Sequence, residues 1–327
     1  MDIIISPYVK ISEHDNYTIY QYPKNYLELF LDELFYDNSI EVTDDYTFKM
    51  SINGFILNKV NLESLIDFEY LRQKQIATYW VSEWYDYLIV NVPDTMITFK
   101  SKLIYLTDND ITDLSEYKIN NIVPDNLVKK ITKTISKMSC SCFIRTDAYS
   151  PKDLLHREIV DTLEVTDAYT ALKLITQSER CSSKLFGGDN KIISKYIVIR
   201  EYVNYDTNYE FRCFIYNWRL TAISQSGFEY NSELHSKKNI IYQSIIKFWD
   251  KFSRICPYSE CTMDLIYNDK WIDNTLNNSG VVIIEFNSFG EHMNASSGLY
   301  DWIKDHNILT RSKTPHFLLA EKPLNVL

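Results

Sequence analysis

Residues 281–291 read VVIIEFNSFGE, an apolar run that ends in polar side chains. The four apolar residues 281–284 lead directly into Glu285, Phe286 and Asn287. Side chains two positions apart on a strand lie on the same face, so a strand here aims Glu285 and Asn287 at one place beside the core. Spacing alone supports a ligand site and an ordinary polar strand end equally, because strands often finish in polar residues.

A second predicted strand supplies another oxygen ligand. In CTMDLIY, residues 261–267, alternation places Thr262, Asp264 and Ile266 on one face. If this strand pairs with the first, Asp264 lies beside Glu285 and Asn287. Two carboxylates and an amide oxygen form the hard-oxygen site that Mg²⁺ takes, usually with waters and nucleotide phosphates completing the octahedron.

Length and composition narrow the class of protein. The 327 residues suffice for two domains, or for one large domain with an extension. A net charge of −10 argues against binding duplex nucleic acid mainly through phosphates, although a local basic groove stays open. No apolar run approaches the roughly 20 residues of a membrane span, and the N-terminus lacks a secretory signal. Six cysteines without disulfide-scaffold spacing predict reduced thiols in a cytoplasmic protein. We also expect a monomer without membrane contact.

The first part of the chain reads as an N-terminal extension, residues 1–75, with residues 76–327 as the main domain. Residues 22–37 have apolar side chains at helical spacing. Residues 46–60 read as a hairpin turning at Asn53-Gly54, a favoured pair for a two-residue turn. Residues 64–88 read as a helix. No linker rich in Pro, Gly or Ser follows, so the extension is free to pack against the main domain.

Strands dominate the main domain. Predicted strands include residues 96–106, 196–203 and a pair turning at Asn217, and amphipathic helices are predicted between them. This pattern predicts an α+β protein. Only 7 glycines are present, with no GxGxxG and no GxxxxGK[ST], which excludes a nucleotide site built on a long glycine-rich loop. The motifs of serine hydrolases and protein kinases are also missing, and no catalytic residue is assigned.

An acidic residue on one strand followed by Glu-x-Asn on the next is similar to the metal-binding core of the ATP-grasp superfamily. More narrowly, residues 80–303 resemble the cell division cycle protein 123 family, which has a divergent ATP-grasp fold. EFRCF and EFNSFGE carry most of the resemblance. The ordered matches are WY at 84–85, TFKS at 98–101, SPKD at 150–153, VIREYV at 198–203, EFRCF at 210–214, AISQ at 222–225, FNSFGE at 286–291 and SGLYDW at 297–302.

The resemblance implies an ATP-grasp-like fold, with mainly antiparallel sheets, flanking helices and the N-terminal extension added. It also implies that ATP and Mg²⁺ are bound. Asp264, Glu285 and Asn287 would hold the metal, with Glu285 standing where the family more often has Asp. One departure follows AISQ, where the family usually continues Arg-Asp-Tyr and this chain has residues 226–228, SGF. Any role of that charged pair is lost here.

The resemblance also places nucleotide-binding residues. Arg145 stands where the family has a phosphate-contacting lysine, six residues before the proline of SPKD, and its planar fork suits phosphate oxygens. Arg212 corresponds to a basic residue aimed at the phosphates. The backbone of residues 201–203 would meet the adenine edge, and Tyr202 could cover its face. The full predicted set is Arg145, Asp147, Lys184, Glu201, Tyr202, Val203, Arg212 and Asn287.

Plainer interpretations stand beside two of these assignments. Glu210 and Arg212 share a strand face, so a solvated or cross-strand ion pair is an alternative to a phosphate ligand. Lys184 lies in SSKLFGGDNK, which is either a flap over the phosphates or an ordinary turn. For the neighbours Arg200 and Glu201 a surface position is favoured for one of the two, because adjacent strand residues face opposite ways.

Two functional hypotheses follow. The resemblance implies a nucleotide-dependent assembly factor, or chaperone, that promotes assembly of translation initiation factor 2 by contact with its gamma subunit. ATP would then order a binding surface without chemistry on a small substrate. The alternative is an ATP-grasp ligase that forms an acyl phosphate for attack by an amine. The lack of a recognisable acceptor pocket favours the assembly factor.

Overall fold

The structure is a computed structural model, and the chain divides into two compact units. The first contains residues 1–77 with 188–192, and the second contains residues 78–187 with 193–327. The predicted domain boundary after residue 75 stays a prediction. The residues that the structure describes are 13–14, 17–18, 40–42, 48–52, 55–57, 72–93, 95–138, 140–187, 192–290, 293 and 295–322.

The first unit contains short antiparallel strands. β1 (Glu13–His14) pairs with β2 (Tyr17–Thr18). A second sheet has the order β3 (Ile40–Val42), β4 (Phe48–Ile52), β5 (Phe55–Leu57). The antiparallel pairing of β4 with β5 confirms the predicted hairpin, whose turn residues lie outside the described residues. The helix predicted over residues 22–37 also lies outside them, and of the helix predicted over 64–88, residues 72–77 and 81–91 are helical.

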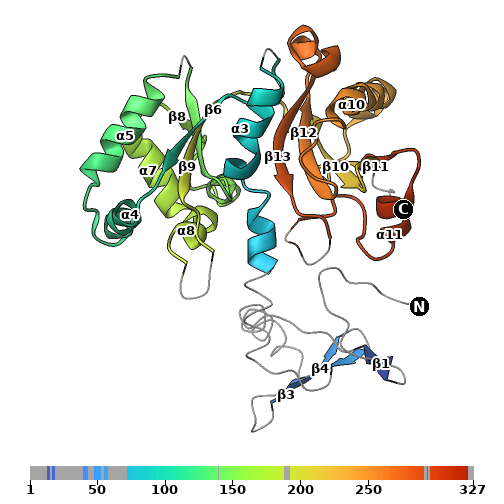
Figure 1. Ribbon diagram of the computed structural model, residues 1–327, viewed down its shortest axis with the longest axis horizontal. Helices are drawn as coiled ribbons and strands as arrows, with labels where there is room; N and C mark the ends of the chain where they lie inside the picture. Colours follow the sequence, from blue (N-terminus) through green and yellow to red (C-terminus); the bar gives the residue numbers. More distant parts are fainter. Residues whose placement is uncertain are drawn as a thin grey trace. The chain divides into compact units, whose positions relative to one another are not determined.

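The second unit is built on two sheets (Figure 1). The smaller has the order β6-β9-β7-β8 and the larger β13-β12-β10-β11-β14. All neighbouring strands are antiparallel except β11 and β14, which are parallel. Their bounds are β6 Ser101–Tyr105, β7 Cys142–Thr146, β8 Glu164–Val165, β9 Tyr196–Glu201, β10 Glu210–Tyr216, β11 Arg219–Gln225, β12 Cys261–Tyr267, β13 Val281–Asn287 and β14 His316–Leu318.

Helices flank both sheets. In Figure 1, α4, α5, α7 and α8 lie beside the smaller sheet, α10 and α11 beside the larger, and α3 between the two. The α-helices are α3 Val81–Asn91, α4 Asp108–Asn120, α5 Asp125–Ile135, α6 Lys152–His156, α7 Ala168–Gln177, α8 Glu179–Leu185, α9 Ser232–Ser236, α10 Lys238–Phe252 and α11 His306–Arg311. Short 3₁₀ helices are η2 Thr207–Tyr209, η3 Asp269–Asn274 and η4 Leu276–Asn278. No helix in the described ranges is long and apolar enough to span a bilayer.

Each sheet has its own apolar core. The smaller sheet packs against α4, α5 and α7 through buried side chains that include Leu114, Ile131 and Leu172. The larger sheet packs against α10 and α3 through a cluster that includes Phe248, Trp84 and Phe286. The Phe286 ring lies 5.2 Å from that of Trp84 and 5.2 Å from that of Tyr258. These contacts anchor β13 to α3 and to the segment before β12.

The pairing of β12 with β13 contains an irregularity that decides which side chains face the core. Asp264 is opposite Glu285, but Leu265 is opposite Ile283, so Ile284 has no partner on β12. In an unbroken strand Glu285 would share the face of Ile283, which lies in the core. The extra residue reverses the alternation, as a β-bulge does. Phe286 therefore enters the core instead, and Glu285 faces away from it.

Candidate functional site

A row of polar side chains crosses the larger sheet. Strand register places Ser224 of β11 opposite Arg212 of β10, Arg212 opposite Asp264 of β12, and Asp264 opposite Glu285 of β13. Directly opposed residues of antiparallel strands have Cβ atoms roughly 4.5–5.5 Å apart. The expectation that Asp264 lies beside Glu285 is confirmed, and Asn287 follows opposite Thr262.

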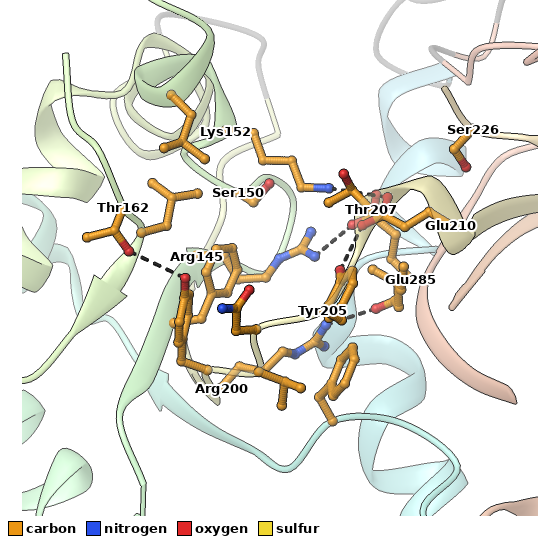
Figure 2. A pocket seen from close by; sticks show the side chains of 18 of the residues that line it. Arg145, Ser150, Lys152, Thr162, Arg200, Tyr205, Thr207, Glu210, Ser226 and Glu285 are labelled. Carbon is orange, nitrogen blue, oxygen red and sulfur yellow. Dashed lines mark hydrogen bonds and ion pairs between the residues drawn. The ribbon is translucent and has the colours of Figure 1, made fainter. Parts of the chain in front are cut away.

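A cleft of about 930 Å³ adjoins this row at Glu285 (Figure 2). This volume is in the range of sites for small ligands and cofactors. The smaller sheet and the segments next to it contribute Arg145, Lys152 and Arg200, whereas β10 and β13 contribute Glu210 and Glu285. Apolar walls come from Phe99, Phe143, Leu163, Val203 and Ile284. Charged and apolar side chains thus line the same cavity.

Arg212 binds Asp264 through two hydrogen bonds. Its Nε donates to Oδ1 at 2.8 Å and its Nη2 to Oδ2 at 2.7 Å, while Nη1 donates to the Ser296 carbonyl at 2.6 Å. Burial alone would lower the pKa of Arg212, but the adjacent Asp264 carboxylate raises it. The Asn287 amide donates to Asp264 Oδ2 at 3.3 Å through its nitrogen, and this bond does not use its Oδ1. Asp264 is therefore the centre of the polar row.

Arg145 binds Glu285. Its Nη1 donates to Glu285 Oε2 at 2.7 Å, Nε donates to the Thr146 carbonyl at 3.0 Å, and Nη2 donates to the Ala148 carbonyl at 3.2 Å. Burial would raise the pKa of Glu285, but the positive charges of Arg145, Lys152 and Arg212 outweigh it and lower that pKa to about 2. Glu285 therefore stays ionised at neutral pH and is held in place.

We expect Glu285 to make stability depend on pH. Its pKa of about 2 in the folded chain lies below the ordinary 4.5, so the unfolded state binds more protons in this interval. The stabilisation is fully present above pH 4.5 and is lost as the pH falls towards 2. Urea unfolding of wild type and Glu285→Gln should therefore show the full difference above pH 4.5, and the difference should shrink as the pH falls towards 2. A difference independent of pH would contradict the ion pair.

The sequence analysis gave no ligand-binding role to three residues of the cleft, which are Lys152, Tyr205 and Glu210. Two of them lie in motifs that match the family. Lys152 belongs to SPKD and Glu210 to EFRCF. Lys152 Nζ lies 3.9 Å from Glu210 Oε2, and Tyr205 donates its hydroxyl hydrogen to Glu210 Oε1 at 2.7 Å. Burial raises the pKa of Glu210 although Lys152 and Tyr205 act to lower it. These side chains form a second polar group beside Glu285 (Figure 2).

Arg200 is buried rather than on the surface. Its Nε donates to Ser101 Oγ at 3.0 Å and its Nη1 to the Ile284 carbonyl at 2.9 Å. Burial, with Arg145 nearby, lowers its pKa to about 10. Ile284 is the bulge residue without a partner on β12, so Arg200 satisfies its carbonyl and fixes the bulge from the other sheet. The Nη2 of Arg200 is buried without a hydrogen-bond partner among the described residues.

The predicted adenine segment, residues 201–203, lines the cleft. The Glu201 N–H donates to the Lys100 carbonyl at 2.8 Å, and the Tyr202 N–H donates to the Ser141 carbonyl at 2.9 Å. The Tyr202 hydroxyl lies 3.4 Å from Thr162 Oγ1. Since these two backbone donors are engaged, a base edge would have to meet the Val203 N–H or the carbonyl groups of the segment.

Asp147 and Lys184 do not line the cleft. Asp147 is buried and accepts hydrogen bonds from Ser82 Oγ, at 2.9 Å, and from Ser194 Oγ. Burial raises the pKa of its carboxyl. Lys184 lies half-buried in α8, and its carbonyl accepts a hydrogen bond from the Ser194 N–H at 2.8 Å. In this structure both residues fix the segment before β9, and their nucleotide roles stay predictions.

The predicted metal ligands offer a suitable donor set for a hard cation. Within the described ranges, no cluster of three His, Cys, Asp or Glu side chains is placed to hold a metal. The predicted set has two carboxylates and one amide, Asp264, Glu285 and Asn287, which are gathered by strand register and the bulge. Carboxylate and amide oxygens are ligands of Mg²⁺, which keeps several waters and phosphate oxygens. The residues therefore fit Mg²⁺, which would share both carboxylates with arginines.

Two named proteins are similar to this chain in sequence. A CDC123-like protein of Acanthamoeba polyphaga mimivirus is 65% identical over 323 residues, which cover 99% of this chain and 99% of that protein. A Dictyostelium discoideum protein named translation initiation factor eIF2 assembly protein is 26% identical over 141 residues, or 41% of this chain and 37% of that one.

A solved structure matches the fold of this chain, and a family model matches most of its sequence. The structure of Cdc123 from Schizosaccharomyces pombe matches with a TM-score of 0.63 and 20% identity, covering 76% of this chain and 98% of that chain. This similarity confirms the predicted α+β fold of mainly antiparallel sheets with flanking helices. The family model described as D123 matches residues 92–324. The chain therefore belongs to the D123 family, which includes the Cdc123 proteins.

Proposed function

We propose that this protein is an ATP- and Mg²⁺-binding assembly factor for translation initiation factor 2 that acts in the cytoplasm through the gamma subunit. The observation that carries the proposal is the cleft at Glu285, which lies opposite Asp264 on the neighbouring strand, with Arg145 bound to Glu285 and Arg212 bound to Asp264. The assembly role is supported by family membership and by the name of the Dictyostelium relative.

The residues divide into groups that suit the parts of Mg-ATP. Asp264, Glu285 and Asn287 would hold Mg²⁺, which when bound supplies positive charge against the phosphate oxygens. Arg145 already binds Glu285 and Arg212 already binds Asp264, so positive charge is in place beside the proposed metal ligands. The apolar side chains of the cleft, with residues 201–203, would contact the adenine.

A ligand in this cleft would connect the two sheets. Arg145 belongs to β7 and residue 201 to β9 of the smaller sheet, whereas Glu210 and Glu285 belong to the larger one. Direct contacts between the two sheets in this region include the Arg145–Glu285 ion pair and the Arg200–Ile284 hydrogen bond. A ligand that contacts both sheets would favour the arrangement of the two sheets that binds it best. Nucleotide binding can thus order a surface for a protein partner without chemistry on a second substrate.

The partner role is tested by co-purification of the whole chain with the isolated gamma subunit of translation initiation factor 2. We expect a stable complex in Mg-ATP and a weaker one in EDTA without nucleotide, because the ligand orders the binding surface. The Asn287→Ala variant should behave as the nucleotide-free protein does. Absence of a complex in Mg-ATP would contradict the assembly role.

The ligase alternative gives a different result with the same protein. A ligase consumes ATP when its acceptor is present, whereas an assembly factor of the proposed kind binds ATP without sustained turnover. ADP release should therefore stay at background when the purified chain is mixed with amino acids or peptides. Sustained release that depends on the added acceptor would replace the proposed function with a carboxylate–amine ligase.

A further inference from the structure

Arg145 is held by the protein through three of its five guanidinium N–H groups. Each of its three guanidinium nitrogens donates a hydrogen bond to a protein oxygen, on Thr146, Ala148 and Glu285. Its side chain is only 4% exposed. A phosphate group that took the place of one of these acceptors would leave a carbonyl or carboxylate oxygen unpaired. The hydrogen bonds of Arg145 hold Glu285 and the turn after β7 in place.

Lys152, seven positions further along the chain, differs from Arg145 in both exposure and hydrogen bonding. Its side chain is 42% exposed, and it lines the cleft. Its ammonium makes no hydrogen bond with the described residues, and its nearest recorded partner is Glu210 Oε2 at 3.9 Å. Figure 2 shows the Lys152 ammonium directed towards Glu210, and the Arg145 guanidinium directed towards Glu285 beside it.

We propose that Lys152 is the cation that contacts the nucleotide phosphates in this chain, and that Arg145 is a positioning residue that holds Glu285. The proposal rests on the proposed nucleotide-binding function. It moves to Lys152 the phosphate contact that the sequence pattern had assigned to Arg145. A lysine ammonium on a flexible stem can turn from Glu210 to a phosphate oxygen without leaving a buried group unpaired, because Glu210 keeps the Tyr205 hydrogen bond.

The electrostatics of the cleft are consistent with these roles. The positive charge of Lys152 contributes to the low pKa of Glu285 and acts against the raised pKa of Glu210. Lys152 therefore already interacts with both carboxylates across the space between them. An incoming triphosphate with Mg²⁺ would bring its negative charge to Lys152 and its metal to Glu285 at the same end of the cleft.

Calorimetric titration of the whole chain with ATP and with adenosine separates the two roles. In EDTA, Lys152→Ala should weaken ATP binding roughly tenfold to a hundredfold and leave adenosine binding unchanged, while Lys152→Arg should retain most of the affinity for ATP. Lys195→Ala is the matched control, since Lys195 pairs with the exposed Asp108 and does not line the cleft. It should bind both ligands as wild type does.

Arg145→Gln and Arg145→Lys should give another pattern. The ratio of ATP to adenosine affinity in EDTA should stay within about threefold of wild type. The gain in ATP affinity on adding Mg²⁺ should fall roughly tenfold or more, because loss of a contact that orients a metal ligand has costs of this order. A change confined to stability would not produce this split. Circular dichroism of each variant establishes that it is folded.

The outcomes distinguish this inference from the proposed function. If wild type binds ATP but Lys152→Ala leaves the ATP-to-adenosine ratio unchanged, or if Arg145→Lys lowers that ratio in EDTA, the assignment of roles is overturned and nucleotide binding stands. If wild type binds neither ATP nor adenosine, the proposed function and this inference both fail. Should the Arg145 variants not fold, the Lys152 pair with its Lys195 control still decides the phosphate role.

Discussion

Replacing Asp264 with alanine should abolish Mg²⁺-dependent binding of ATP while leaving the chain folded. Asp264 lies opposite Glu285, binds Arg212 through both oxygens and accepts from Asn287. Its removal takes away one proposed metal ligand and releases the side chains beside the other two. Changes behind a metal ligand cost roughly 10- to 100-fold in affinity, so loss of the ligand itself should cost at least about a hundredfold.

Two controls make the Asp264 result specific. Asp264→Asn keeps the shape and removes the charge, so it should lose Mg²⁺ dependence and keep part of the contact with Arg212. Asp113→Ala removes an exposed carboxylate on α4 and should bind as wild type does. Asn287→Ala should resemble Asp264→Ala. If Asp264→Ala or Asn287→Ala binds Mg-ATP as wild type does in calorimetry, the metal assignment is wrong.

Replacing Phe286 with alanine should cost about 3–5 kcal/mol of the free energy of unfolding. Phe286 is 3% exposed and packs edge-on against Trp84 and Tyr258 with centroid distances of 5.2 Å. The truncation leaves a cavity between β13, α3 and α10. Because Phe286 lies between Glu285 and Asn287 in sequence, the same change loosens the strand that carries both proposed ligands.

Urea unfolding with Phe228→Ala as the matched control measures this effect. Phe228 is 71% exposed, so its truncation should change stability by no more than about 0.5 kcal/mol. Phe286→Leu should lie between wild type and Phe286→Ala, because it retains part of the buried volume. A loss below about 1 kcal/mol for Phe286→Ala would show that the core around β13 does not hold this strand.

Hydrophobic patterning was sufficient to predict the strand pair that carries the site. Apolar runs bounded by polar residues identified residues 261–267 and 281–287 as neighbouring strands, and the structure pairs them antiparallel. The face of β13 on which Glu285 lies was harder to derive from the sequence. Regular alternation places Glu285 with Ile283, and only the unpaired Ile284 turns Glu285 towards the cleft. A bulge depends on the register of two strands, which one strand's sequence does not specify.

Long-range contacts explain why the sequence did not predict the positions of Arg200, Lys152 and Glu210. Arg200 contacts Ser101 and Ile284, which are 99 and 84 positions away in the chain. Nothing in the local sequence YIVIRE separates a buried arginine of this kind from a surface one. Lys152 and Glu210 stood inside matched motifs, but only the fold shows that they meet in one cavity. Local pattern specifies elements, whereas side-chain partners depend on how distant elements pack.

The most direct test of the central claim is calorimetric titration of the wild-type chain with ATP in the presence and absence of Mg²⁺. The cleft and its paired carboxylates predict one ATP per chain, bound more tightly with Mg²⁺ than in EDTA. The Mg²⁺-dependent part should disappear in Asp264→Ala. Absence of ATP binding by the folded wild-type chain in Mg²⁺ would contradict the account.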